Sequence, residues 1–217
     1  MVFCDINIGS IGVRPQWAKG HNVTKLGSDP KEVLMSKLAI FFPGIGYTHD
    51  KPLLYYSRKM AIDKGYETIC IEYSNLPDKV KGDKERMKQS LLMAYEQSCE
   101  QLTDIDFSAY DDILIVGKSL GTVVAAKYHE EYCGTARLVL FTPVEATFRF
   151  KLNDAVAFIG DDDSWSNLET VKELANNSNV PLHIYPDCNH SLEVSGDYAR
   201  NINYLSDVMH TTDEFIG

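Results

Sequence analysis

The sequence has few basic residues and no long apolar run. Its 21 lysines and arginines are outnumbered by 31 aspartates and glutamates, so the formal net charge is -10. An acidic chain of this kind is a poor partner for nucleic acids and for anionic membrane surfaces, because both carry charge of the same sign. No stretch stays apolar over the length that spans a bilayer. We therefore expect no nucleic-acid partner and no membrane association.

Paired cysteines and a secretion signal are also missing. The five cysteines are odd in number and scattered, with no Cys-x-x-Cys pair: Cys4, Cys70, Cys99, Cys133 and Cys188. This usage is typical of reduced thiols and gives no support for a structural zinc site. The first twelve residues contain polar residues and glycine instead of a basic start followed by an apolar run. We expect no signal peptide and a cytoplasmic location.

No repeat, low-complexity tract or interdomain linker divides the 217 residues, a length that suits one domain with a sizeable core. Compact apolar runs predict buried strands at six places: residues 37–42, 67–73, 113–116, 136–141, 155–159 and 180–185. Apolar residues at helical spacing predict helices between these strands: residues 52–64, 83–103, 167–176 and 196–210, with a further helix directly after Ser119.

Alternating strands and helices predict an α/β fold. Because the strands are continuous apolar runs, the expected architecture is a three-layer α/β/α sandwich with a mostly parallel, doubly wound sheet. The whole chain, residues 1–217, is assigned to this one domain. Before residue 37 the pattern is weak, and we expect at most an edge strand at residues 2–8 and a short strand at 21–25.

The most informative stretch is residues 113–122, where four apolar residues run directly into Gly117-Lys118-Ser119-Leu120-Gly121. Small residues follow, which is typical of a helix packed closely on a sheet. This order predicts a strand, a sharp turn that carries Ser119, and a helix. Such a turn leaves no room for a side chain on either flank, so glycines 117 and 121 have a steric role. Ser119 would then be a nucleophile.

The same residues also resemble the end of a phosphate-binding P-loop, because lysine and serine follow Gly117. That motif requires a glycine at position 112, where this chain has Asp112. It also requires a glycine-rich loop where residues 113–116 are apolar. A strand cannot wrap a phosphate group with its backbone amides, so the sequence favours the nucleophile interpretation.

A serine nucleophile needs a general base, and the functional loops of a parallel α/β sheet lie at the carboxyl ends of its strands. His190 follows the strand at 180–185 and fits that place, whereas the other histidines fall within a strand, in helices or in early loops. The base also needs a carboxylate to orient it. The strand at 155–159 leads to Asp161, Asp162 and Asp163, any of which could serve. Three adjacent aspartates are also typical of a solvated turn or a helix N-cap.

Two backbone N–H groups must hold the oxyanion of an acyl-transfer reaction. Leu120 is expected to supply one, because it lies at a helix N-terminus where amides lack internal partners. Residues 43–46, Pro-Gly-Ile-Gly, form a loop after the first strand, and we expect the second from Ile45 in preference to Gly46. A simple strand-to-helix turn would need the same glycines. Tyr47 and Phe148 are assigned to substrate binding, although both also suit a packing role.

Together these segments resemble the α/β-hydrolase superfamily over about residues 37–210. Four motifs carry the resemblance: residues 117–121 look like the nucleophile elbow, 42–45 are similar to the oxyanion loop, 158–163 to the Gly-x-x-Asp acid turn, and 189–192 to the histidine segment. The resemblance implies a triad in the order Ser119, Asp163, His190, and it selects Asp163 among the three aspartates. Pro43 departs from the family, which usually has histidine there.

The resemblance implies a serine hydrolase that cleaves a small ester or thioester through an acyl-enzyme, with a small-molecule acyl substrate and no metal or organic cofactor. Acyl transfer to another acceptor and cleavage of peptide or C–C bonds stay open. The connection between the strands at 136–141 and 155–159 is too short for a helical lid, so we expect an open, shallow site. The alternative is a catalytically inactive scaffold that binds a ligand or a protein. A distance between Ser119 and His190 well beyond hydrogen-bond range would favour that alternative.

Overall fold

The computed structural model describes residues 35–217, and the two strands expected at 2–8 and 21–25 lie outside this range. Six strands form one sheet in the order β2-β1-β3-β4-β5-β6, and every neighbouring pair is parallel. The strands are β1 (Lys37–Phe42), β2 (Glu67–Cys70), β3 (Asp112–Lys118), β4 (Arg137–Phe141), β5 (Ala155–Gly160) and β6 (Leu182–Tyr185). The expected mostly parallel sheet is confirmed.

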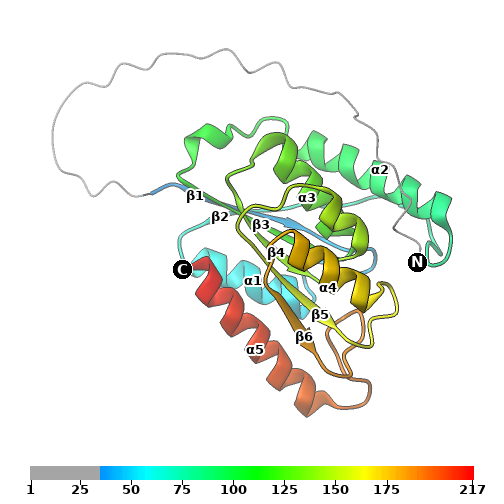
Figure 1. Cartoon of the computed structure of the whole chain (residues 1–217). Helices are drawn as coiled ribbons and strands as arrows, with labels where there is room; N and C mark the ends of the chain where they lie inside the picture. The colour runs from blue at the N-terminus through cyan, green and yellow to red at the C-terminus, as the bar shows by residue number, and fades with distance from the viewer. Residues whose placement is uncertain (1–34) are drawn as a thin grey trace, which may run out of the picture.

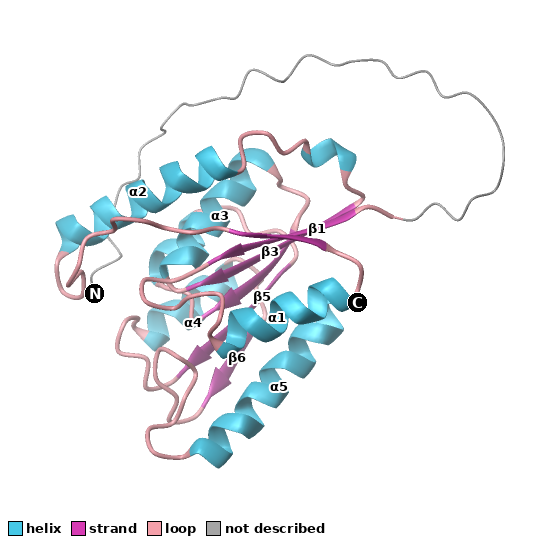
Figure 2. Cartoon of the chain, turned by 180° about the vertical axis from the view of Figure 1, so that it is seen from behind, coloured by secondary structure: helices cyan, strands magenta, loops and turns pink. Residues whose placement is uncertain are grey.

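Helices cover both faces of the sheet, so the molecule has the three layers that the alternating pattern predicts (Figures 1 and 2). On one face lie α1 (Pro52–Asp63) and α5 (Tyr198–Ile216). On the other lie α2 (Lys84–Gln101), α3 (Leu120–Tyr132) and α4 (Leu168–Asn177). Two short 3₁₀ helices, η1 (Phe107–Ala109) and η2 (Glu145–Arg149), lie in the connections. No helix within residues 35–217 is long and apolar enough to cross a membrane.

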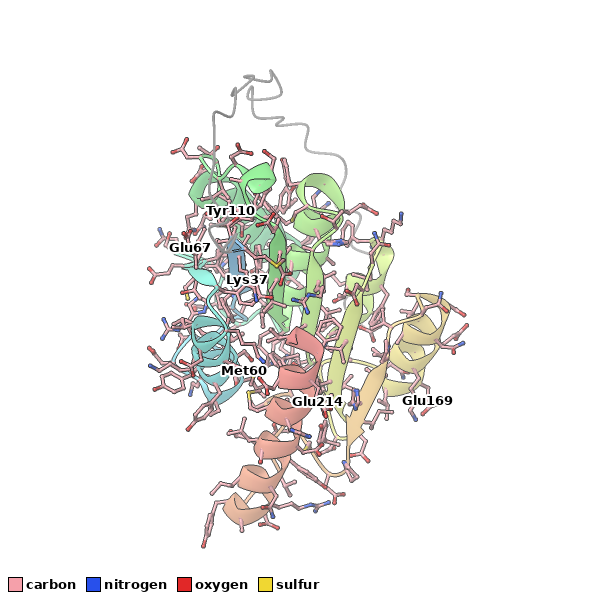
Figure 3. All side chains as sticks on the ribbon, turned by 90° about the vertical axis from the view of Figure 1, so that its left-hand side faces the viewer. Lys37, Met60, Glu67, Tyr110, Glu169 and Glu214 are labelled. Atoms are coloured by element: carbon pink, nitrogen blue, oxygen red, sulfur yellow. The ribbon has the colours of Figure 1, made fainter. Side chains whose placement is uncertain are left out.

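The continuous apolar strands separate two hydrophobic cores, because successive side chains of a strand point to opposite faces. In β1, Leu38, Ile40 and Phe42 join the core beneath α2, α3 and α4. Ala39 and Phe41 join the core beneath α1 and α5. Figure 3 shows these two helices as neighbours, with Met60 labelled on α1 and Glu214 on α5.

Two elements differ in extent from the sequence prediction. The expected buried strand at 67–73 ends at Cys70 and is half-buried, because β2 is an edge strand with β1 as its neighbour in the sheet. Helix α5 continues to Ile216, six residues past the predicted end at 210. Its last turns stay in contact with the core through Thr212 and Ile216, both buried.

The parallel arrangement brings the carboxyl ends of all six strands to one edge of the sheet. The loops after β1, β3, β5 and β6 carry the residues that the sequence selects as catalytic. Ligand sites of open α/β sheets lie at this edge.

Candidate active site

The turn between β3 and α3 is as sharp as its sequence predicts. Ser119 has a φ of 55° and a ψ of -120°, a backbone conformation that residues other than glycine rarely adopt. A Cβ atom on Gly117 would lie 2.8 Å from Thr122 Cα, and one on Gly121 would lie 2.2 Å from the carbonyl oxygen of Phe42. The prediction that neither flank has room for a side chain is confirmed.

Ser119, His190 and Asp163 lie in one hydrogen-bonded row. His190 Nε2 is 2.6 Å from Ser119 Oγ, and His190 Nδ1 is 2.7 Å and 2.9 Å from the two carboxylate oxygens of Asp163. Asp163 accepts the Nδ1–H hydrogen bond, which leaves the Nε2 lone pair facing the serine hydroxyl. Ser119 and Asp163 are 8% and 7% exposed, so the row is largely shielded from water. A general base can remove the serine proton at this distance.

The three aspartates of the acid turn differ in their contacts. Asp163 Oδ1 accepts a hydrogen bond from the Trp165 backbone N–H at 2.9 Å as well as contacting His190. Asp161 accepts from the backbone N–H of Asp187 at 2.6 Å and so fastens the turn to the histidine loop. Asp162 is exposed. Of the three carboxylates left open by the residue pattern, Asp163 is the one that reaches the imidazole.

The expected oxyanion loop lies against the nucleophile turn. A Cβ on Gly44 would be 3.1 Å from Ser119 Cβ, so the two backbones are in close contact. Reciprocal hydrogen bonds of 3.2 Å between Gly44 and Tyr47 close a tight turn with Ile45 and Gly46 at its tip. The turn itself does not use the Ile45 N–H, and the first turn of α3 likewise does not use the Leu120 N–H, so both expected donors are available.

Two side chains that the sequence interpretation did not select contact the imidazole or its loop. The Trp165 ring stacks on His190 with 5.3 Å between centroids and 25° between planes. Lys118 is 1% exposed, and its Nζ lies 2.8 Å from the His190 carbonyl oxygen. An aromatic residue two positions after the acid was a visible signal for the first contact. Nothing in the elbow motif indicates the second.

Burial and charge shift the titration of this site. The pKa of His190 is lowered from its ordinary value, first by burial and then by the Lys118 charge, while its hydrogen bond with Asp163 acts in the opposite direction. Burial lowers the pKa of Lys118 to about 7, although the Asp163 charge opposes the shift. The imidazole therefore stays neutral, and able to accept a proton, at lower pH than an exposed histidine.

The two residues assigned to substrate binding have different surroundings. Tyr47 lines a largely apolar pocket of about 310 Å³ between the starts of α1 and α5, and its hydroxyl accepts a hydrogen bond from the Leu53 N–H at 3.1 Å. Phe148 is 9% exposed and packs in the core beneath α3. A second cleft, of about 510 Å³, begins at Ile45 and Gly46 and extends to Tyr73. Within residues 35–217, no three His, Cys, Asp or Glu side chains are grouped as metal ligands.

Comparisons with known proteins support this fold through structure alone. No protein-family model matches the sequence, and no curated protein is similar to it. Est1E from Butyrivibrio proteoclasticus, solved with ferulic acid bound, has a TM-score of 0.60 and 13% identity, with 83% of this chain and 88% of that chain covered. Mouse alpha/beta hydrolase domain-containing protein 10 also has a TM-score of 0.60, with 10% identity and 82% and 88% coverage.

A third solved structure is a serine hydrolase from Xanthomonas campestris that is described as lacking a lid. Its TM-score is 0.54 at 14% identity, over 87% of this chain and 86% of that one. Sequence identities this low carry information on the fold and not on the substrate. The protein therefore has the fold of the α/β-hydrolase superfamily, as the four motifs in its sequence predict.

Proposed function

We propose that the protein is a serine hydrolase that cleaves a small ester or thioester. The observation that carries the proposal is the row of contacts from Ser119 Oγ to His190 Nε2, at 2.6 Å, and from His190 Nδ1 to Asp163, at 2.7 Å. An inactive binding scaffold does not require this alignment. The strained backbone of Ser119 supports the same conclusion, because such strain is concentrated at functional sites.

The arrangement supports a two-step mechanism. Ser119 Oγ attacks the acyl carbonyl while His190 Nε2 takes its proton, and the N–H groups of Leu120 and Ile45 stabilise the oxyanion. His190 then gives the proton to the leaving alcohol or thiol, and an acyl-enzyme remains on Ser119. Water, deprotonated by His190, attacks this ester and releases the acid. Asp163 keeps Nδ1 protonated and stabilises the imidazolium that forms in each step.

The test uses two small probes on the full chain. Short-chain p-nitrophenyl esters should be hydrolysed, and a fluorophosphonate should label Ser119 covalently. Ser119→Ala should abolish labelling and reduce ester turnover by about 10⁶-fold. Ser108→Ala is a suitable control, because this exposed serine lies in η1, away from the site. Unlabelled wild-type protein, or equal turnover in wild type and Ser119→Ala, would refute the proposal.

A further inference from the structure

The mechanism proposed above makes no use of Lys118, the last residue of β3 and the one directly before the nucleophile. The residue is 1% exposed, a degree of burial that lysine almost never shows without a charged partner. Among residues 35–217, however, no carboxylate forms an ion pair with it. Such a costly arrangement calls for a physical explanation.

Neutral groups from three different loops surround the ammonium instead. Nζ lies 2.6 Å from Thr142 Oγ1, in the loop after β4, and 2.8 Å from the His190 carbonyl oxygen, in the loop after β6. It also lies 4.8 Å from the ring centroid of Tyr47, in the loop after β1. Lys118 therefore connects the turn that carries Ser119 to the loops after β1, β4 and β6. One of its partners is the carbonyl group of His190, the proposed general base.

We propose that Lys118 is a positioning residue for His190. Its hydrogen bond to the His190 carbonyl holds the imidazole between Ser119 and Asp163, and its positive charge keeps that imidazole uncharged. This inference rests on the proposed hydrolase function. Lys118 does not contact the reacting atoms, so its effect on the reaction is transmitted through His190.

Charged groups face His190 from three elements: Lys118 from β3, Lys81 from the loop before α2, and Asp163 from the loop after β5. The two lysines lower the pKa of the imidazole, as burial does, and Asp163 raises it. The pKa of Lys118 itself is about 7, so its charge increases as the pH falls below neutral. The Lys118 charge is therefore present over the pH range in which His190 would otherwise gain a proton and lose its function as a base.

The experiment measures the rate at which a fluorophosphonate labels Ser119 as a function of pH. Lys118→Met keeps an unbranched side chain but removes both the donor and the charge. At pH 8 we expect labelling to slow by about tenfold or more, because the imidazole is held less firmly. The acid limb of the profile, which is the fall in labelling rate at low pH, should also move to higher pH. Lys127→Met is the matched control: Lys127 is 2% exposed in α3 and pairs with Glu131, and its removal should leave the profile unchanged.

Thr142→Val provides a second variant that keeps the lysine and removes one of its two hydrogen-bond acceptors. The less stabilised ammonium should lose its proton at lower pH. The labelling rate should therefore lie between those of wild type and Lys118→Met, and the acid limb should again move to higher pH. An NMR titration of the His190 imidazole measures the same shift without any reaction. If Lys118→Met does not fold by circular dichroism, the Thr142→Val result decides.

Two results would overturn the inference. One is a folded Lys118→Met or Thr142→Val protein whose labelling rate and acid limb are the same as those of the wild type. The other is a lower rate with an unchanged acid limb and an unchanged titration of His190, because a purely structural defect slows labelling equally at every pH. Failure of the wild type itself to label would instead refute the hydrolase proposal, so the two failures can be told apart.

Discussion

At the scale of single residues, the decisive contact is between Asp163 and the imidazole. Asp163→Asn places an amide where Nδ1–H needs an acceptor, which favours the wrong tautomer of His190. We expect fluorophosphonate labelling to slow by about 10⁴-fold while the protein stays folded. Asp162→Asn is the matched control, since Asp162 is an exposed neighbour on the same turn. A similar loss in both variants would show that the turn as a whole, and not the Asp163 carboxylate, is responsible.

Backbone position was enough to predict Ser119 and His190 of the candidate triad, whereas Asp163 was chosen among three adjacent aspartates only through the resemblance to the Gly-x-x-Asp acid turn. Ser119 lies between two glycines that the turn requires, and Asp163 and His190 follow the ends of strands. The contacts of Lys118 and Trp165 were not predictable from spacing. They depend on the direction in which a side chain leaves a strand end or a turn, and that direction is set by packing against loops distant in sequence.

At the scale of elements, the close approach of α3 to β1 and its following loop limits what the elbow tolerates. A methyl group on Gly121 would lie 2.2 Å and 2.5 Å from the carbonyl oxygens of Phe42 and Pro43. Gly121→Ala should therefore lower the free energy of unfolding by about 3 kcal/mol or more, measured by urea denaturation. Gly134→Ala, where the nearest atom would be 3.9 Å away, should change it little. Equal free energies of unfolding for wild type and Gly121→Ala would mean that α3 can move away from the sheet without cost.

The existence of each strand and α-helix in residues 35–217 could be predicted from apolar runs, helical spacing and the small residues after Ser119, but the two 3₁₀ helices and some limits could not. The end of β2 depends on its place at the sheet edge, which is a non-local property. The last turns of α5 have partly polar residues, and their burial depends on α1 packing beside them. Strand order likewise arises from contacts between distant segments, so periodicity predicted a parallel sheet without ordering its strands.

At the scale of the whole molecule, the opposite edge of the sheet has a stabilising network of its own. The Arg137 guanidinium, at the start of β4, donates to the carbonyl oxygens of Phe215 and Ile216 at 2.9 Å and 2.7 Å. It also contacts the Asp112 carboxylate at 2.7 Å and the Tyr66 hydroxyl at 2.6 Å. This network joins the end of α5 to the amino ends of β3 and β4. Ser119 lies at the opposite, carboxyl end of β3.

Arg137→Met should therefore separate stability from activity. We expect the free energy of unfolding to fall by about 2–4 kcal/mol, because the variant leaves two partly buried carbonyl oxygens without this donor and removes the cation beside the Asp112 carboxylate. The labelling rate of Ser119 in the folded protein should not change. Lys172→Met, which removes an exposed pair with Glu169, should alter neither quantity measurably. A strong loss of labelling in folded Arg137→Met would show that the two edges of the sheet are coupled.

The stacking of Trp165 on His190 has an optical consequence. An excited indole transfers an electron to a protonated imidazole far more readily than to a neutral one, so the charge of His190 controls how brightly Trp165 emits. The chain has two tryptophans, and Trp17→Phe would leave Trp165 as the sole source of indole emission. Fluorescence that dims as the pH is lowered through the pKa of His190 would then follow the proton on the proposed general base, with no substrate present.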